Sequence, residues 1–175
     1  MSTSLLPGWI EPYRLAAREE HLEGVMPLSG FARLAEAVGS QSGDCRVWLD
    51  FGIDTQGRRQ IRGHLEASLQ LPCRRCLSRI DTSVDSEFLL GMVSSDALAA
   101  ELPSTHEPVL VEDEQMNLLA MVEDELILSL PQVVYHDEAD CNVSRDQLTS
   151  GAEEEQSPTP PESPFEVLKR LKDKS

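Results

Sequence analysis

Three runs of alternating hydrophobic and polar residues occupy the middle of the chain, at residues 45–53, 61–71 and 80–90. Side chains two residues apart lie on the same face of a β-strand, so this period of two predicts three strands that each bury one face. Short turns separate the runs, one at Asp54–Gly57 and one around Cys73 and Cys76. Strands joined by short turns pair antiparallel, and we therefore expect a β-meander.

Hydrophobic residues at helical spacing predict a helix on either side of these strands. We expect the first helix to begin with Ser29 as its N-cap and to end at Gly39. Its apolar positions are Phe31, Leu34, Ala35 and Val38. The second predicted helix spans residues 118–130, where Asn117 caps its start and Pro131 stops it.

The remaining pattern is weaker. Residues 94–102 are typical of a short helix, residues 108–111 of a further strand, and residues 7–23 of an extended or mixed segment. Together these elements predict an α+β fold, in which an antiparallel β-meander is packed with two or three helices. Such a meander could close into a barrel-like form.

The composition divides the chain into three parts. Residues 1–145 carry the predicted α+β domain. Residues 146–163 are rich in Ser, Pro and Glu and are too polar to bury a core, which predicts a flexible acidic linker. Residues 164–175 predict a short basic amphipathic helix. Its apolar face consists of Phe165, Leu168 and Leu171, and its basic residues include Lys169, Arg170 and Lys172.

The charge of the chain is strongly acidic and uneven. The 175 residues contain 31 acidic and 15 basic side chains, a net charge of −16, which argues against a simple basic nucleic-acid-binding protein. Residues 44–79 hold seven arginines and four acids, whereas residues 80–156 hold nineteen acids and one arginine. A mildly basic centre is therefore joined to an acidic half.

Several features favour the cytoplasm. The N-terminal residues lack the basic start and apolar core of a signal peptide, and no apolar run approaches the roughly 20 residues of a membrane span. Four cysteines in a chain of this length do not form a secreted disulfide pattern. We expect a cytoplasmic protein with reduced thiols.

The strongest candidate for special chemistry is the turn Leu71-Pro-Cys-Arg-Arg-Cys-Leu77, which holds Cys73 and Cys76. Structural zinc needs four thiolate or imidazole ligands, and the other candidates are His136 and Cys141. A redox pair needs a helix N-terminus in a βαβ unit, whereas this pair lies between two predicted antiparallel strands. A turn with two packed, inert thiols is the third interpretation, and the residues alone leave all three open.

A basic cluster surrounds that turn and the preceding one. It consists of Arg58, Arg59, Arg62, Arg74, Arg75 and Arg79, with Trp48 on the same outward face. Arginines beside an exposed aromatic ring are typical of RNA binding, although cross-strand charge pairing explains them equally well. A pairing of Ile53 with Ile61 would place Trp48 opposite Glu66. The two turns lie roughly 30 Å apart for strands of about ten residues, so the arginines do not form one compact patch.

Three consecutive carboxylates, Glu123 to Glu125, lie in the second predicted helix. Successive helical residues point about 100° apart, so the three cannot meet at one metal, and we expect a solvated face. Catalytic signatures such as a Ser/His/Asp set, a phosphate-binding glycine loop or an H-E-x-x-H helix are missing from the sequence. We therefore expect a protein that is not an enzyme and has no small-molecule substrate.

Three segments of the chain together resemble the bacterial YceD family, the large ribosomal RNA subunit accumulation proteins. They are the cysteine turn, the string Met116-NLLAMVEDELILSLP-Gln132 with the nearby Tyr135-His-Asp and Cys141, and the closing Ser163-Pro-Phe-Glu-Val-Leu-Lys-Arg-Leu171. The resemblance runs in order along the chain. It implies a non-enzymatic cytoplasmic factor for 23S ribosomal RNA. Many relatives carry a second Cys-x-x-Cys, where this chain has only Cys141 with His136 upstream.

The charge distribution adds a hypothesis about partners. RNA affinity comes mainly from neutralised phosphates, so a protein of charge −16 should bind bare RNA poorly. We expect an adaptor whose arginine-rich meander touches large-subunit ribosomal RNA or a pre-ribosomal particle, while its acidic half engages a basic ribosomal protein. The alternatives are a small zinc-binding structural module, a Cys-x-x-Cys redox protein, and an α+β binding domain of unrelated role.

Overall fold

The computed structural model describes residues 4–143 of the chain. The chain divides into two units, residues 1–141 and 142–175, and the first unit is described here. The acidic linker predicted at residues 146–163 and the helix predicted at residues 164–175 lie outside the described residues.

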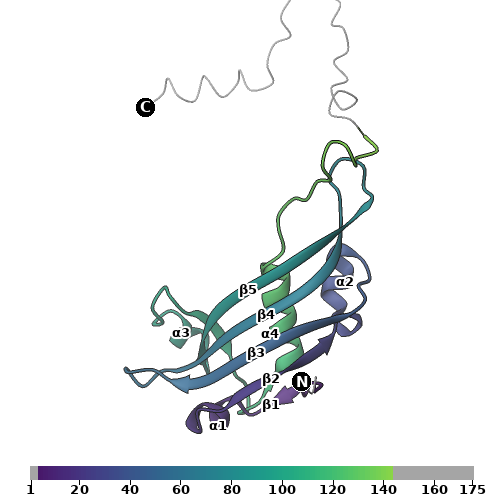
Figure 1. Ribbon diagram of the computed structural model, residues 1–175. Coiled ribbons are helices and arrows are strands. Elements are labelled where there is room, and N and C mark those ends of the chain that lie inside the picture. Colours follow the sequence, from purple (N-terminus) through teal and green to yellow (C-terminus); the bar gives the residue numbers. More distant parts are fainter. Residues whose placement is uncertain (1–3, 144–175) are drawn as a thin grey trace, which may run out of the picture. The chain divides into compact units, whose positions relative to one another are not determined.

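The centre of the fold is a five-stranded sheet with the strand order β2-β3-β4-β5-β6 (Figure 1). Its strands are β2 (His21–Pro27), β3 (Asp44–Ile53), β4 (Arg59–Pro72), β5 (Arg79–Val93) and β6 (Glu107–Leu110). Neighbouring strands are antiparallel, except that β6 runs parallel to β5. The three alternating runs are β3, β4 and β5, so the antiparallel meander is confirmed.

The barrel-like form considered for the meander is not what the chain adopts, because the sheet remains open with β2 and β6 at its two edges. A parallel partner needs a crossover, and the chain makes one through α3 (Asp96–Ala99) before it forms β6. The buried face of the sheet is covered by helices instead of by the sheet itself. The α+β class therefore holds, with an open sheet.

Edge strand β2 was not predicted as a separate strand, and its burial pattern explains why. Gly24, Val25 and Met26 are buried in succession, so the alternation that identifies a strand is absent. The N-terminal segment pairs locally with this edge of the sheet, where Leu6 N–H donates to Val25 O at 3.1 Å, and the Leu6 side chain lies over Gly24. A Cβ at Gly24 would lie 2.4 Å from Ser4 O, which makes glycine necessary at this close approach.

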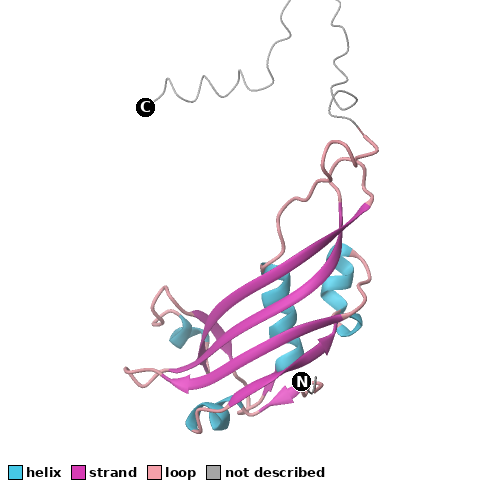
Figure 2. Cartoon of the chain, viewed as in Figure 1, coloured by secondary structure: helices cyan, strands magenta, loops and turns pink. Residues whose placement is uncertain are grey.

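Helices α2 (Ala32–Val38) and α4 (Leu118–Leu128) lie behind β3, β4 and β5, against one face of the sheet (Figure 2). Helix α1 spans Pro12–Ala17, and a short β1–β7 ladder joins Trp9–Ile10 to Met116–Asn117. The core between sheet and helices includes Val47, Leu65 and Leu126, each 0% exposed. The opposite face of the sheet carries the polar residues.

The helix caps match the predictions in part. The side chain of Asn117 accepts a hydrogen bond from Ala120 N–H at 2.9 Å, which confirms it as the cap of α4. The predicted N-cap Ser29 is wrong, because it lies in the 3-10 turn Leu28–Gly30 and Phe31 precedes α2 without a side-chain cap. The predicted end of that helix at Gly39 is confirmed, with φ at 83°.

Candidate functional site

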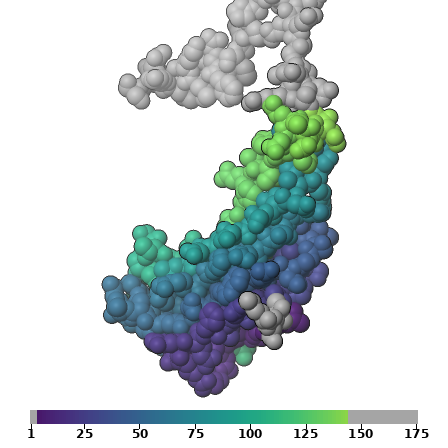
Figure 3. Space-filling view, viewed as in Figure 1, coloured from purple at the N-terminus to yellow at the C-terminus, as the bar shows by residue number. Residues whose placement is uncertain are grey.

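Two cysteines of the turn between β4 and β5 meet two residues that follow α4. The ligand atoms of Cys73, Cys76, His136 and Cys141 all lie within 4.8 Å of one another. In the space-filling view, the green segment that follows α4 lies against the teal tip of the hairpin (Figure 3). The structure therefore brings together the four residues named from the sequence as metal ligands. We call them the Cys3His cluster.

The turn is folded so that both of its thiols face the same side. Cys73 N–H donates to Ser78 O at 2.8 Å, and Leu77 N–H donates to Cys73 O at 2.9 Å. Leu77 has φ of 62°, an uncommon left-handed conformation for a residue other than glycine. Arg75 N–H donates to Cys73 Sγ at 3.4 Å, as backbone amides do around thiolate ligands. The backbone is thus organised around the sulfur atoms.

Three further contacts hold the segment after α4 against this turn. Arg74 N–H donates to Val134 O at 3.0 Å, and Arg75 Nη2 donates to His136 O at 2.6 Å. The guanidinium of Arg75 also lies 5.4 Å from the ring centre of Tyr135. The arginine pair between the two cysteines therefore helps to close the cluster. The Arg75 side chain thus has a structural role that is separate from the RNA contact predicted for it.

The orientation of His136 is that of a histidine prepared for a metal. Its Nδ1 lies 3.3 Å from Cys76 Sγ, and its Nε2 lies 3.3 Å from Arg79 O. A carbonyl acceptor at one ring nitrogen fixes the tautomer and leaves the other nitrogen free to coordinate. Such an outer hydrogen bond accompanies almost every metal-binding histidine.

The electrostatics of the Cys3His cluster favour thiolates. Burial by itself would raise the pKa of Cys73, but backbone hydrogen bonds at Cys76, His136 and Arg75 lower it to about 5. The pKa of Cys76 is also lowered, since hydrogen bonds from Ser78 outweigh the effect of burial. The hydrogen bond to Cys73 raises the pKa of His136. Cys45 differs, because burial in the core raises its pKa to about 12.

Three sulfur atoms and one imidazole nitrogen form a donor set that suits zinc. Zn²⁺ prefers four tetrahedral ligands of this kind in structural sites. This group could therefore hold a metal such as zinc. The arrangement does not suit a redox pair, since Cys73 is 0% exposed and the turn joins two antiparallel strands instead of starting a helix.

The predicted RNA-binding arginines fall into two groups. Four of them already contact the protein: Arg58 pairs with Asp54 at 2.6 Å, Arg59 covers the Tyr13 ring, Arg75 contacts Tyr135, and Arg79 donates to Gln70 O and Val38 O. Within residues 4–143, no hydrogen bond or ion pair engages the guanidinium groups of Arg62 and Arg74. These two side chains are exposed and remain available to a partner.

The open face of the sheet contains Trp48, whose ring stacks on His64 with centroids 4.9 Å apart. Both residues border a shallow groove of about 400 Å³ together with Arg62. The expected pairing of Ile53 with Ile61 is wrong by two residues, because Ile53 pairs with Arg59 and Trp48 faces His64. The rest of this face shows cross-strand pairs, His64 with Asp85 at 3.0 Å and Arg46 with Glu66 at 3.7 Å.

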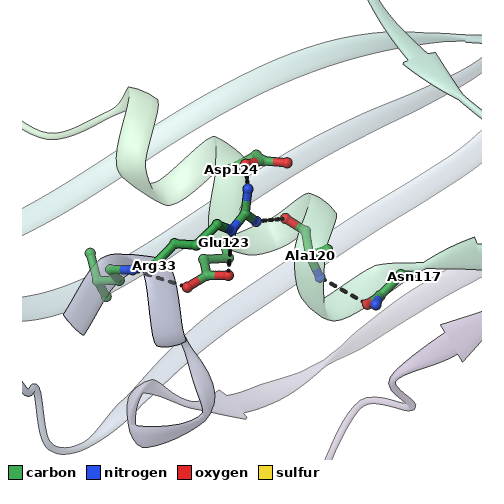
Figure 4. Close-up of polar contacts among 6 residues, drawn as sticks. Arg33, Asn117, Ala120, Glu123 and Asp124 are labelled. Carbon is green, nitrogen blue, oxygen red and sulfur yellow. Dashed lines mark hydrogen bonds and ion pairs between the residues drawn. The ribbon is translucent and has the colours of Figure 1, made fainter. Parts of the chain in front are cut away.

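The solvated face expected for Glu123 to Glu125 is wrong, since only Asp124 is exposed. Glu123 is 6% exposed and accepts from Leu34 N–H and Arg33 Nε, both at 3.0 Å (Figure 4). Arg33 also contacts Asp124 and donates to Ala120 O at 2.9 Å. A carboxylate near the first turn of α2 satisfies an otherwise unpaired amide. Arg33 and Glu123 therefore fasten α4 to α2.

No helix among residues 4–143 is long and apolar enough to cross a membrane.

The chain is similar to known proteins along almost its whole length. Residues 61–172 match the family model described as "Large ribosomal RNA subunit accumulation protein YceD". A protein of the same name from Haemophilus influenzae is 33% identical over 170 residues, which cover 97% of each chain. No solved structure matches the chain.

Proposed function

The chain belongs to the YceD family of large ribosomal RNA subunit accumulation proteins, and on this premise we propose that it supports the accumulation of 23S ribosomal RNA. The observation that carries this proposal is the match to a protein of that name over 97% of both chains. We propose that the protein acts in the cytoplasm as a binding factor of the pre-ribosomal particle and not as an enzyme.

The Cys3His cluster is proposed to bind one zinc ion with a structural role. Four protein ligands fill a tetrahedral zinc ion and leave no position for a substrate, unlike catalytic zinc sites. The ligands come from the β4–β5 turn and from the segment after α4, so the ion would join two parts of the chain that lie 60 residues apart between Cys76 and His136. Bound zinc would supply a rigid cross-link, and the four ligand residues would set its geometry.

The tip of the β4–β5 hairpin is proposed to contact ribosomal RNA. Arg74 presents an exposed guanidinium without a partner among the described residues, and Arg75 is stacked with the 52% exposed Tyr135. Arginine binds phosphate, and exposed aromatic rings stack on unpaired bases. Arg62 beside Trp48 offers a second, separate contact on the open face.

The acidic half explains why the target would be a particle and not free RNA. The net charge of −16 repels bare RNA, and the few free arginines neutralise few phosphates. Carboxylates elsewhere on the chain attract basic proteins at long range, and ribosomal proteins are such partners. We propose that simultaneous contacts to RNA and to a basic protein give the factor its affinity.

Depletion followed by complementation tests the proposed function. Cells depleted of the protein should show a lower ratio of 23S to 16S ribosomal RNA, and the wild-type chain should restore it. The double variant Arg62→Ala/Arg74→Ala should restore it poorly. The matched control Arg18→Ala removes an exposed arginine that follows α1 and should restore it fully. An unchanged ratio on depletion would refute the proposal.

Metal analysis tests the zinc centre separately. The purified wild-type protein should contain about one zinc per chain, and His136→Ala should lose it, whereas the exposed His21→Ala should retain it. The Cys76→His variant separates zinc from thiol chemistry, since imidazole is a zinc ligand but has no sulfur to oxidise. If that variant retains zinc but loses function, the redox alternative gains support and the structural role is contradicted.

A further inference from the structure

A groove of about 570 Å³ lies between α4 and the edge strand β6. Its floor is largely apolar and includes Leu90, Met116 and Met121. Two leucines on its rim are exposed, Leu110 at 44% and Leu128 at 72%. Exposed apolar surface of this kind, bordered by polar residues, is typical of protein-binding sites.

Glu125 is a buried carboxylate that lines this groove. Glu125 is 9% exposed, and no hydrogen bond or ion pair reaches its side chain from elsewhere in residues 4–143. Glu107 and Asp124 also line the groove. Burial, together with the negative charges of Glu107 and Asp124, raises the pKa of Glu125 to about 7.

No arginine or histidine that the structure describes forms an ion pair with this carboxylate. Arg33 contacts Glu123 and Asp124 from the side of α2. A buried carboxylate without a cation is costly, and two neighbouring carboxylates add to the cost. The groove therefore combines an apolar surface with a carboxylate that no cation among the described residues neutralises.

A basic side chain with a long aliphatic stem meets both requirements. The stem of lysine or arginine covers apolar surface while its charged head reaches a carboxylate. Aliphatic neighbours in the same segment would cover Leu110 and Leu128 on the rim. The charge complementarity selects a basic occupant over an acidic or neutral one.

We propose that the groove between β6 and α4 binds a basic, apolar-anchored segment of a partner protein, with a lysine or arginine of that partner paired to Glu125. This inference rests on the proposed function in one respect, because it locates the docking site of the basic ribosomal protein. Peptide binding to the purified chain is measured without ribosomes, so its failure is distinct from a failure of the role in ribosomal RNA accumulation.

The test is an NMR titration of the ¹⁵N-labelled full chain with the synthetic peptide LKKLLKLLKKLL at physiological salt. We expect the largest amide shifts around Leu110, Met121 and Leu128. Glu125→Gln should weaken binding by about tenfold, because it removes a buried charge partner. The control Glu101→Gln removes one exposed charge outside the groove and should change the affinity by less than about twofold.

Three results would overturn the proposal. Equal weakening by Glu125→Gln and Glu101→Gln would show attraction by bulk charge alone. Groove resonances that do not respond to the peptide would show that the groove is closed or filled by the chain itself. Groove shifts that depend only on protein concentration would assign the groove to a second copy.

Discussion

Glu125→Gln should stabilise the protein at alkaline pH, because glutamine keeps the shape of the side chain and removes its buried charge. The pKa of Glu125 is about 7 in the folded chain against an ordinary value of 4.5. Each unit of pKa corresponds to about 1.4 kcal/mol, which gives a ceiling of about 3 kcal/mol. Water in the open groove screens part of this destabilisation, so we expect the ionised Glu125 to cost the folded state about 1 to 2 kcal/mol.

The sign of the pH dependence follows from proton binding. Between the unfolded and folded pKa values, the folded state binds more protons than the unfolded state, so the free energy of unfolding falls as the pH rises. The contribution of Glu125 to wild-type stability is therefore fully present below about pH 4.5 and is lost as the pH passes about 7. Glu125→Gln has no titratable group at this position, so its free energy of unfolding does not fall in this way as the pH rises.

Urea denaturation near pH 5 and near pH 8 measures the effect. We expect Glu125→Gln to exceed the wild type by about 1 to 2 kcal/mol near pH 8 and by much less near pH 5. Glu101→Gln is the matched control and should equal the wild type at both pH values within about 0.5 kcal/mol. An equal gain in both variants, or a gain that does not depend on pH, would refute the assignment of a buried, uncompensated charge to Glu125.

Three further substitutions test the packing of the fold by the same denaturation assay. Arg33→Met leaves Glu123 buried without a cation and should destabilise by about 2 kcal/mol, while the exposed Arg18→Ala should cost less than about 0.5 kcal/mol; equal effects would contradict the fastening of α4 to α2. Gly63→Ala places a Cβ 2.1 Å from the Phe88 ring and should cost about 1 to 3 kcal/mol, with a smaller cost in a Phe88→Ala background. Asn117→Ala removes the N-cap of α4 and should cost about 1 kcal/mol, a loss that Asn117→Ser largely avoids.

The strands β3, β4 and β5 could be predicted because each buries one face, so their polarity alternates along the sequence. The register in which β3 pairs with β4 could not be predicted. Asp54 accepts hydrogen bonds from Gln56 N–H at 2.8 Å and Arg58 N–H at 2.9 Å, and this side chain tightens the turn so that pairing begins at Arg59. A side-chain contact inside a turn thus moved every cross-strand neighbour by two residues.

The two candidate sites differ in how much of each was visible in the sequence. The Cys3His cluster could be named because cysteine and histidine are few and metal chemistry restricts their combinations. The burial of Glu123 could not be predicted, because its partner Arg33 lies 90 residues away. Glu125 shows the same limit, since only the packing of β6 beside α4 separates a buried carboxylate from an ordinary helix surface.

Crosslinking in living cells tests the central claim most directly. Ultraviolet crosslinking, purification of the tagged full chain and sequencing of the attached RNA should recover 23S ribosomal RNA well above an uncrosslinked sample. Arg62→Ala/Arg74→Ala should recover much less, and Arg18→Ala should recover as much as the wild type. Absence of 23S enrichment, or equal recovery by all three chains, would contradict the proposed contact between this protein and large-subunit ribosomal RNA.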